Sequence, residues 1–478
     1  MPPIPTRRLR RGDLYQALRA AILDGTLAPG ERLPSTRQAA LDYGISRGTM
    51  EEVFAQLTEE GFLERAVGKG TFVAATVSRL TATPPPRCSR KRKLPKPSRR
   101  GSSVSASAAC REPEELRPFN AGIADTSEFP WQQWHRLEIR AARELGRESL
   151  TFADPRGFPQ LRAAIARYLA QFRGIRCRAE QVIVFNSAQQ ALNALAVLLL
   201  DAGDRVWLED PCYLGARAAW ERLGSAAVVP VPVDEHGIRV EAGLRLTPRA
   251  RLAYVTPSHQ YPTGVVLSLE RRLALLEWAA RAGSWIIEDD YDGEFRHHGQ
   301  PLTALYSLDS QARVIYVGTL NKSMFVSLRL AYAVVPEELL EPLANIRTQF
   351  DGFTPAPQQM AMSLFMDEGH FSSHLRHMRG VYAGKRAKLI EGLEPLRAEG
   401  WSWPEIPAGM HLLTHHQNGQ YVRTVARKSS LDLALLSSYR IVPARGDGLL
   451  LRFGALSLSA IEPGIARLVE TAAKVHRS

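Results

Sequence analysis

Residues 79–111 divide this chain into two parts, because their composition prevents them from joining a folded core. The stretch contains ten lysines and arginines and no acidic residue, so it supplies +10 of the net charge of +12. It also contains three consecutive prolines and a tail rich in serine and alanine. Segments of high net charge with few large apolar residues do not fold by themselves. We therefore expect two folded units, at 8–78 and 117–478, and a linker at 79–116.

The first part, 13–75, has the pattern of a small helical unit that ends in a hairpin. Asp13 can cap a first helix, Ser35 opens a second with a capping box, and Ser46 can cap a third. A short turn joins the last two helices, as in a helix-turn-helix. Two short strands around 67–70 follow and predict a hairpin, or wing, behind the helices.

This part resembles the winged helix-turn-helix of the GntR family of bacterial regulators, an α+β fold. The motifs that carry the resemblance are GTLAPGERLPSTR, GISRGTM and LTEEGFLERAVGKGTFV, in this order. The resemblance implies contact with double-stranded DNA through helix N-termini and the wing, since amides and hydroxyls hold phosphate and arginine reads guanine edges. Two alternatives stay open, with Arg47 as a solvated arginine and Ser46 as a helix cap alone. The residues implied are Ser35, Arg37, Ser46, Arg47, Thr49, Gly68, Lys69 and Gly70.

The basic run at 87–100 within the linker has two compatible interpretations. Its eight lysines and arginines form a solvated tether, or they contact DNA phosphates without reading the base sequence. The dependence of DNA affinity on salt separates the two. If the slope stays the same after these charges are neutralised, the phosphate contact is excluded.

From about Arg117 onward, buried strands alternate with helices, which predicts an α/β fold with a largely parallel sheet. Polar stretches follow several of these strands, and in an open parallel sheet they would gather at one edge, where ligands bind. The expected strands are 181–185, 205–208, 251–256, 284–288 and 314–317, and the expected helices include 159–171, 188–200 and 269–281.

Lys322 lies in a tight polar loop directly after the strand at 314–317, and Arg329 follows seven residues later. Lysine rarely lies between a buried strand and an apolar stretch. One that does is either salt-bridged or used as an amine, for instance as the Schiff-base partner of an aldehyde cofactor. A surface lysine after a strand is the simpler alternative.

Pyridoxal phosphate would require an amine for its aldehyde, a carboxylate for its ring nitrogen, and amides, hydroxyls and an arginine for its phosphate. Carboxylates cluster at 288–292, where a buried strand ends, and uncompensated charge there would be costly. The segment 186–190 joins a strand to a helix, and a helix N-terminus binds anions. Turns at 209–213 and 260–264 complete the same expected edge of the sheet.

Residues 117–475 resemble the class I aminotransferase domain, the large α/β fold of pyridoxal-phosphate-dependent transferases (fold type I). The motifs are FADPRGFPQLR, NSAQQAL, EDPCY, PSHQYPTG, EDDYDGEFR and VGTLNKS, in this order. With the GntR-type head, the whole chain resembles the MocR/GabR subfamily of transcriptional regulators. Relatives of this kind join a DNA-binding head to an aminotransferase-like domain that binds pyridoxal phosphate.

The resemblance implies a role for each of eight residues. Lys322 forms the Schiff base, Asp289 pairs with the pyridine nitrogen, and Tyr291 binds the ring hydroxyl. Tyr213 lies over the ring, or else packs in the core. The phosphate is held by Ala188, Gln189, Thr319 and Arg329. We expect local hydrogen bonds for Asp290, Asp292 and Glu294, and His259 stays open between a loop histidine and a ligand contact.

Several positions depart from the family's pattern. Phe152 replaces a tyrosine that reaches the phosphate across the dimer, and Ser187 with Ala188 replaces Gly-Ser. Asn321 replaces the serine before the lysine. Tyr261 stands where working aminotransferases have asparagine against the ring hydroxyl. The changes at Phe152, at Ser187 with Ala188 and at Asn321 each weaken or rearrange phosphate binding without removing the lysine, the carboxylate or Arg329.

The resemblance also implies an arginine in a late strand that binds the carboxylate of a substrate or effector. The candidate is Arg452, two residues later than usual, which keeps it on the same face of the strand. The preferred interpretation is a homodimeric regulator, its heads swapped head-to-tail, that senses an amine, an amino acid or the cofactor itself. The alternatives are a genuine aminotransferase with an accessory head, and a cofactor-free repressor with a degenerate site.

The cysteines and the apolar runs bear on the compartment. The four cysteines contain no C-x-x-C pair, which argues against structural zinc and a disulfide framework. No apolar run approaches the ~20 residues of a membrane helix, and the basic start has no apolar core behind it, unlike a secretory signal. We expect a cytoplasmic bacterial protein, without a metal, that lies on the nucleoid when bound to DNA.

Overall fold

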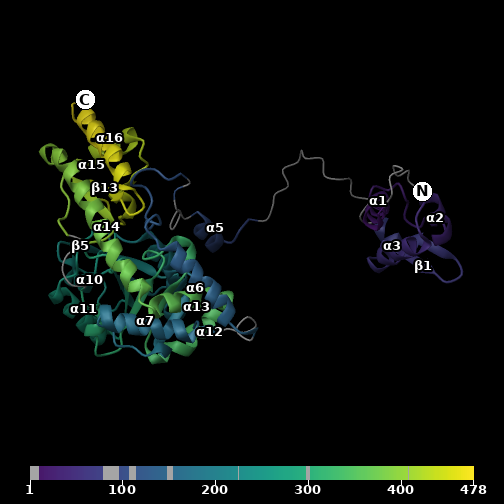
Figure 1. Ribbon diagram of the computed structural model, residues 1–478, viewed down its shortest axis with the longest axis horizontal. Helices are drawn as coiled ribbons and strands as arrows, with labels where there is room; N and C mark the ends of the chain where they lie inside the picture. The colour runs from purple at the N-terminus through teal and green to yellow at the C-terminus, as the bar shows by residue number, and fades with distance from the viewer. Residues whose placement is uncertain are drawn as a thin grey trace. The chain divides into compact units, whose positions relative to one another are not determined.

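The chain forms two compact units, Met1–Lys96 and Pro97–Ser478, in the computed structural model (Figure 1). The boundary falls inside the expected linker. Most of the basic run, up to residue 95, lies outside the described residues, so its proposed contact with DNA phosphates is not tested. The structure describes residues 10–78, 96–106, 113, 115–147, 154–223, 225–297, 302–406 and 408–477.

The first unit has three helices followed by a two-stranded antiparallel hairpin. Fully buried Leu18, Phe54 and Leu57 form its core with residues from all three helices and both strands. This arrangement confirms the predicted helix-turn-helix with a hairpin behind it. The elements are α1 (Arg11–Leu23), α2 (Thr36–Tyr43), α3 (Arg47–Glu59), β1 (Leu63–Ala66), β2 (Gly70–Val73) and η1 (Ala75–Val77).

Two of the three predicted helix caps are confirmed. The hydroxyls of Ser35 and Ser46 each accept the N–H of the residue three positions further on, at 3.2 and 3.1 Å. The prediction that Asp13 caps α1 is wrong, because the helix begins earlier and Arg10 is its N-cap. Asp13 instead lies in the first turn, where its carboxylate accepts the N–H of Arg10 at 3.3 Å and faces the positive end of the helix dipole.

The second unit is built on an eight-stranded sheet of order β3-β10-β9-β8-β7-β4-β5-β6. β10 runs antiparallel to both neighbours and β6 antiparallel to β5, while the other pairs are parallel. The carboxyl ends of β3, β4, β7, β8 and β9 therefore meet at one edge, as predicted. The strands are β3 (Val182–Phe185), β4 (Arg205–Asp210), β5 (Ala227–Asp234), β6 (Gly237–Ile238), β7 (Leu252–Val255), β8 (Trp285–Asp290), β9 (Val314–Thr319) and β10 (Ala331–Val334).

Helices cover both faces of this sheet, which is why its strands read as continuous apolar runs. Successive side chains of β8 show the alternation, since Ile287 packs in the cluster with α8 and Ile286 in the cluster with α11. The helices are α5 (Arg99–Ser105), α6 (Trp131–Glu144), α7 (Pro159–Phe172), α8 (Ala188–Leu199), α9 (Leu214–Ala218), α10 (Val240–Leu246), α11 (Leu269–Ala282), α12 (Glu337–Asp351), α13 (Ala356–Asp367) and α14 (His370–Leu393). Shorter turns are η3 (Ala179–Gln181), the π-helical η4 (Ala219–Leu223), η5 (Leu305–Leu308), η6 (Val326–Leu328) and η7 (Glu394–Glu399).

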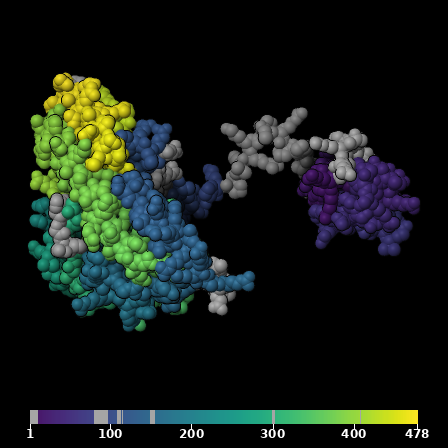
Figure 2. Space-filling view, viewed as in Figure 1, coloured from purple at the N-terminus to yellow at the C-terminus, as the bar shows by residue number. Residues whose placement is uncertain are grey.

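The end of the chain forms a second, three-stranded antiparallel sheet of order β11-β13-β12. In Figure 2, α14 in green and α16 in yellow run along one face of this unit. No helix in the described ranges is long and apolar enough to cross a membrane. The elements are β11 (His411–His416), α15 (Gly419–Ser429), β12 (Ala434–Leu435), η8 (Leu436–Tyr439), β13 (Asp447–Arg452) and α16 (Leu458–His476).

Candidate functional site

The side chain of Lys322 meets that of Arg452 beside Gly122. Lys322 is half-buried in the turn after β9, and its Nζ donates a hydrogen bond to the carbonyl oxygen of Gly122. A β-carbon placed on Gly122 would lie 3.3 Å from Cδ of Arg452 and 3.6 Å from Nζ of Lys322. Among the described residues no carboxylate lies within 4.0 Å of this Nζ, so the salt-bridged interpretation of Lys322 finds no support. The amine is held by a neutral acceptor next to a second cation.

Asp289 offers an unpartnered, buried carboxylate oxygen at the end of β8. The residue is 5% exposed, and its Oδ2 accepts a hydrogen bond from the hydroxyl of Tyr254 at 2.6 Å. Its Oδ1 has no partner among the described residues. Burial raises the pKa of Asp289 to about 7, against the opposing effect of the Tyr254 hydrogen bond. A protonated pyridine nitrogen would satisfy Oδ1 and restore the charge, so this residue fits pyridoxal phosphate.

Tyr291, directly after β8, contacts His259, whose role the sequence did not decide. Its hydroxyl lies 3.0 Å from Nδ1 of His259, which in turn lies 2.9 Å from Oδ2 of Asp292. Asp292 thus bonds to a side chain of the protein, as predicted, but the partner is not local, since it lies 33 residues away in the chain. Asp290 is likewise bound by Tyr316, 26 residues away, and Glu294 by Tyr168, 126 residues away.

Ala188 and Gln189 form the first turn of α8, after β3. The hydroxyl of Ser187 accepts the N–H of Gln190 at 3.1 Å, so this departure from the family pattern supplies the helix cap. The side chain of Gln189 turns toward α9. Its Nε2 donates to the carbonyl of Gly215 at 2.9 Å and its Oε1 accepts from the hydroxyl of Tyr213 at 3.4 Å. The backbone of this helix start is therefore the group suited to an anion.

The loop that carries Lys322 is closed by its own polar groups. Oγ1 of Thr319 accepts the N–H of Asn321 at 3.3 Å, and Oδ1 of Asn321 accepts the N–H of Leu330 at 2.9 Å. Arg329 has a φ of 56° and an exposed side chain without an ion pair or hydrogen bond to another described residue. A positive φ is uncommon outside glycine, and the closed loop imposes it here. The guanidinium is thus free of protein carboxylates in this part of the chain.

Arg452 ends β13 and is held by two tyrosines, one of which the sequence did not indicate. Its Nη2 donates to the hydroxyls of Tyr261 at 3.1 Å and Tyr439 at 2.5 Å, and its Nη1 donates to the carbonyl of Asn120 at 2.7 Å. The prediction of a late strand for Arg452 is confirmed. Tyr261, which stands where working aminotransferases are expected to have asparagine, accepts a hydrogen bond from this arginine through its hydroxyl.

In the first unit, the residues implied to face DNA lie at two exposed places. Arg37, Ser46 and Arg47 lie at the starts of α2 and α3, and Arg47 makes an exposed ion pair with Glu51 at 2.8 Å. Thr49 is half-buried behind them. The wing tip holds the exposed Gly68, Lys69 and Gly70, and φ values of 72° and 111° require the two glycines.

Two features of the site were missed or remain untested. The sequence contained no signal for Tyr254 as the partner of Asp289, because the hydroxyl comes from the neighbouring strand, 35 residues away. Phe152, where the family has a tyrosine that reaches across the dimer, lies outside the described residues.

Comparisons with known proteins agree with both units. Residues 10–73 match the family described as "Bacterial regulatory proteins, gntR family" and residues 119–447 match "Aminotransferase class I and II". The probable rhizopine catabolism regulatory protein MocR of Rhizobium meliloti is 35% identical over 463 residues, which is 95% of this chain and 92% of the relative. The pyridoxine biosynthesis transcriptional regulator PdxR of Corynebacterium glutamicum is 30% identical, covering 92% of this chain and 91% of the relative.

Solved structures agree on the fold of the second unit. The α-aminoadipate aminotransferase LysN of Thermus thermophilus, complexed with N-(5'-phosphopyridoxyl)-L-leucine, superposes with a TM-score of 0.72 at 26% identity. The match covers 79% of this chain and 97% of that one. The mixed sheet and its covering helices are therefore those of an aminotransferase, as the sequence motifs predicted.

Proposed function

Because the chain belongs to the MocR/GabR subfamily of GntR-family transcriptional regulators, we propose that it binds pyridoxal phosphate at Lys322 and couples the state of this site to its affinity for a double-stranded DNA operator. The head at 8–78 would bind DNA and the domain at 117–478 the cofactor. We place this function in the cytoplasm, in a head-to-tail, domain-swapped homodimer.

The observation that carries the proposal is the unpartnered Oδ1 of Asp289 at the same edge of the sheet as the Lys322 amine. When bound, pyridoxal phosphate supplies an aldehyde that condenses with an amine, with loss of water, and a ring that withdraws electrons. Asp289 would keep the ring nitrogen protonated, and Tyr213 would cover the ring. The phosphate would lie between the first turn of α8, Thr319 and Arg329.

Arg452 gives the site a preference for effectors with a carboxylate. Its guanidinium lies beside the Lys322 amine, and the hydroxyls of Tyr261 and Tyr439 hold it in place. An amine that also carries a carboxylate would react at one end and pair with Arg452 at the other. The effector class we propose is therefore an amino acid, with the cofactor itself as the second candidate.

Contacts within the second unit support a route from the site to the linker. Tyr213 is the N-cap of α9, which continues directly into the π-helical η4. Arg222 in η4 donates to the hydroxyl of Ser103 in α5 at 3.0 Å, and α5 lies within the segment expected as linker. A ligand that moves Tyr213 would thus act on the segment that leads to the head. Coupling requires a ligand with different affinity for the two arrangements.

The proposal is tested by measuring DNA affinity in three states of the full chain. A labelled DNA fragment from upstream of the chain's own gene is titrated without cofactor, with pyridoxal phosphate, and with cofactor plus each of a panel of amino acids. We expect the dissociation constant to change by about 5-fold to 150-fold between two of these states. Lys322→Arg keeps the positive charge but offers no reactive amine, so it should show one affinity throughout.

The remaining outcomes identify the alternatives. Equal affinities in all three states of a wild type that shows the cofactor's absorbance would overturn the coupling. Steady turnover of an amino acid with a keto acid would identify a genuine aminotransferase. The 2-aminoadipate transaminase of Thermus thermophilus, 31% identical over 61% of this chain, makes that assay worthwhile. A wild type without any cofactor absorbance would identify a cofactor-free repressor.

In the head, two neighbouring substitutions should separate stability from DNA binding. Ser46→Ala removes the cap of α3 and should lower the free energy of unfolding of the head by about 1 kcal/mol. Arg47→Ala removes only an exposed ion pair, so the free energy of unfolding should stay nearly unchanged. The DNA affinity of Arg47→Ala should nevertheless fall by about 1–3 kcal/mol. Thermal unfolding and DNA titration of both variants check this, and unchanged DNA affinity in Arg47→Ala would make Arg47 a solvated surface residue.

A further inference from the structure

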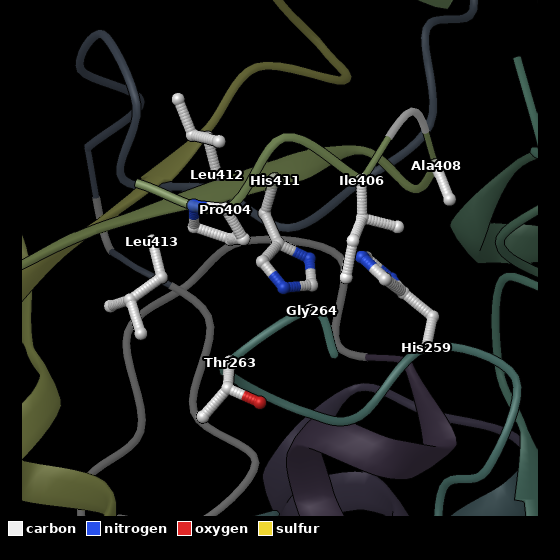
Figure 3. Close-up of a pocket in the computed structure, with 9 residues that line it drawn as sticks. All are labelled: His259, Thr263, Gly264, Pro404, Ile406, Ala408, His411, Leu412 and Leu413. Atoms are coloured by element: carbon white, nitrogen blue, oxygen red, sulfur yellow. The ribbon is translucent and has the colours of Figure 1, made fainter. Parts of the chain in front are cut away.

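Two buried side chains, His259 and Asp292, lie in series behind the hydroxyl of Tyr291. Nδ1 of His259 lies 3.0 Å from the Tyr291 hydroxyl and 2.9 Å from Oδ2 of Asp292. His259 is 4% exposed and Asp292 is 2% exposed. In Figure 3, His259 projects from its loop toward a small cavity that His411 borders from the other side. His259, the partner of Tyr291, and Asp292, the partner of His259, are therefore both shielded from solvent.

The position of the proton between Asp292 and His259 decides the direction in which the hydroxyl of Tyr291 donates. A carboxylate only accepts hydrogen bonds, so the contact with Asp292 requires a proton on Nδ1 of His259. Nδ1 then has no lone pair for the hydroxyl of Tyr291, which can only accept from the same N–H. The O–H of Tyr291 is therefore free to donate to another acceptor. In the proposed complex, that acceptor would be the ring hydroxyl oxygen of the cofactor.

We propose that Asp292, acting through His259, directs the hydroxyl proton of Tyr291 toward the ring oxygen of pyridoxal phosphate. This proposal rests on the proposed function, since it requires the cofactor at Lys322. Asp292 and His259 are positioning residues, and only Tyr291 touches the cofactor. The arrangement uses the logic of a carboxylate that fixes a histidine tautomer, here applied to a tyrosine instead of a serine.

Two glycines leave the space in which the imidazole of His259 packs. A β-carbon on Gly409 would lie 2.1 Å from Cε1 and 2.6 Å from Nδ1 of the ring, and 2.8 Å from Oδ2 of Asp292. A β-carbon on Gly264 would lie 3.1 Å from Nε2. Gly409 is fixed in turn, since its N–H donates to the carbonyl of Phe295 at 2.8 Å. A larger residue at either position would therefore displace the ring from Tyr291 and Asp292.

The same geometry argues against a cation at this place. Ligand atoms of His259, Asp292 and His411 lie within 4.8 Å of one another, which is the spacing of a metal site. Nδ1 of His259, however, already has two hydrogen-bond partners, and Gly409 lies directly against the gap between this nitrogen and Asp292. The hydrogen bonds from His259 to Tyr291 and Asp292 account for these short distances without an added ion.

The charges around Asp292 and His259 predict one direction of change in the pH midpoint of the bound cofactor. The Asp292–His259–Tyr291 hydrogen bonds, here called the relay, predict the other direction, so an experiment can separate the two. Asp289 on β8 interacts with Asp292, and Arg173 and Arg296 line a cavity with His259 and Asp292. Lys322 after β9 and Arg452 on β13 act on the neighbouring His411. Burial holds the pKa of His411 on β11 well below its ordinary value, so that ring is neutral. Removing the negative charge of Asp292 would, by Coulomb's law alone, disfavour a protonated nitrogen at Lys322.

The relay predicts the reverse. With pyridoxal phosphate bound, a hydrogen bond from Tyr291 to its ring oxygen would matter most when the nitrogen of Lys322 carries no proton, because the oxygen would then have no other donor. Losing the Tyr291 donor therefore raises the pH midpoint of the absorbance change of bound pyridoxal phosphate. We expect Tyr291→Phe to raise this midpoint by about 1 pH unit, a tenfold change in proton affinity.

Asp292→Asn is the decisive variant. Asparagine removes the negative charge that holds the proton on Nδ1, so the other tautomer becomes available and the hydroxyl of Tyr291 can donate to the lone pair of Nδ1. We expect the midpoint to rise, as in Tyr291→Phe, and the double variant to rise no further than Tyr291→Phe alone. His411 is a neutral ring at the same cavity, so His411→Asn is the matched control and should leave the midpoint unchanged. A midpoint that falls in Asp292→Asn, or that shifts again in the Tyr291→Phe background, overturns the relay.

The test also separates this proposal from the one on which it rests. A wild type that takes up no pyridoxal phosphate defeats both the proposed function and the relay. A wild type with the absorbance band and an Asp292→Asn midpoint equal to the wild type defeats the relay alone. If Asp292→Asn does not fold, His259→Phe keeps a ring in the same space but offers no acceptor for the Tyr291 proton, so its midpoint should stay near the wild-type value; a rise to the level of Tyr291→Phe there overturns the proposal.

Discussion

Lys322→Ala is expected to abolish the absorbance between about 330 and 430 nm that the chain acquires with pyridoxal phosphate. The band requires an amine within reach of the aldehyde, and Nζ of Lys322 is the amine that lies beside Arg452 at the sheet edge. Lys385 cannot replace it, because its ammonium is buried in an ion pair with Asp125 at 2.5 Å. The loss should therefore be complete and not partial.

The matched control is a lysine whose removal leaves the site intact. Lys474 lies on α16 and pairs with Glu470 on the surface, so Lys474→Ala should keep the full band. Lys322→Ala should unfold at nearly the wild-type temperature, because Nζ makes a single hydrogen bond to Gly122. A band that persists in Lys322→Ala would place the reactive amine elsewhere and remove the basis of the proposed function.

The parts of the fold that follow from short-range patterns were predictable from the sequence. The β-branched runs of β8 and β9 predict buried strands, and the polar turns after them place Asp289 and Lys322 at strand ends. In a parallel sheet these ends meet, so the gathering of the two residues required no knowledge of long-range contacts. The caps at Ser35 and Ser46 are local for the same reason.

The contacts that the sequence did not indicate are those between residues far apart in the chain. Gly122 receives the hydrogen bond of Lys322 from 200 residues away, and its small size matters only because Arg452 also lies there. Tyr254 bonds Asp289 from the neighbouring strand. The error at Asp13 has a different origin, since an aspartate is favourable both as an N-cap and three positions further into the first turn. Local preference alone does not choose between them.

Asp289→Asn is expected to change cofactor affinity and cofactor-free stability in opposite directions. Burial raises the pKa of Asp289 from its ordinary value of 3.8 to about 7 in the folded chain. The folded state therefore binds a proton that the unfolded state has released between these two values. Stability contributed by this group is present below about pH 4 and is lost as the pH rises through 7. At pH 8 the folded chain without cofactor carries an uncompensated buried carboxylate.

Asparagine keeps the acceptor for Tyr254 and carries no charge, so at pH 8 the cofactor-free variant should unfold at a higher temperature than the wild type. The gain should be on the order of 4 kcal/mol at pH 8, should shrink toward pH 5, and should vanish only below about pH 4, where the carboxyl is protonated in the unfolded chain as well. With pyridoxal phosphate the sign reverses, because the pyridinium loses its buried partner. Affinity should fall about 100-fold or more, as expected for half of a buried ion pair.

Glu288→Gln is the control for this reversal. It removes a buried carboxylate whose pKa burial also raises to about 7, one residue earlier and on the opposite face of β8. Its two oxygens accept the N–H groups of Leu305 and Tyr306, at 2.8 Å each, so it has no part in the site. Cofactor affinity should stay at the wild-type value in this variant. Thermal unfolding at pH 5 and pH 8, with and without cofactor, compares the three proteins. If Asp289→Asn destabilises the cofactor-free chain at pH 8, or binds the cofactor as tightly as the wild type, then the orphaned Oδ1 is not the partner of the pyridine nitrogen.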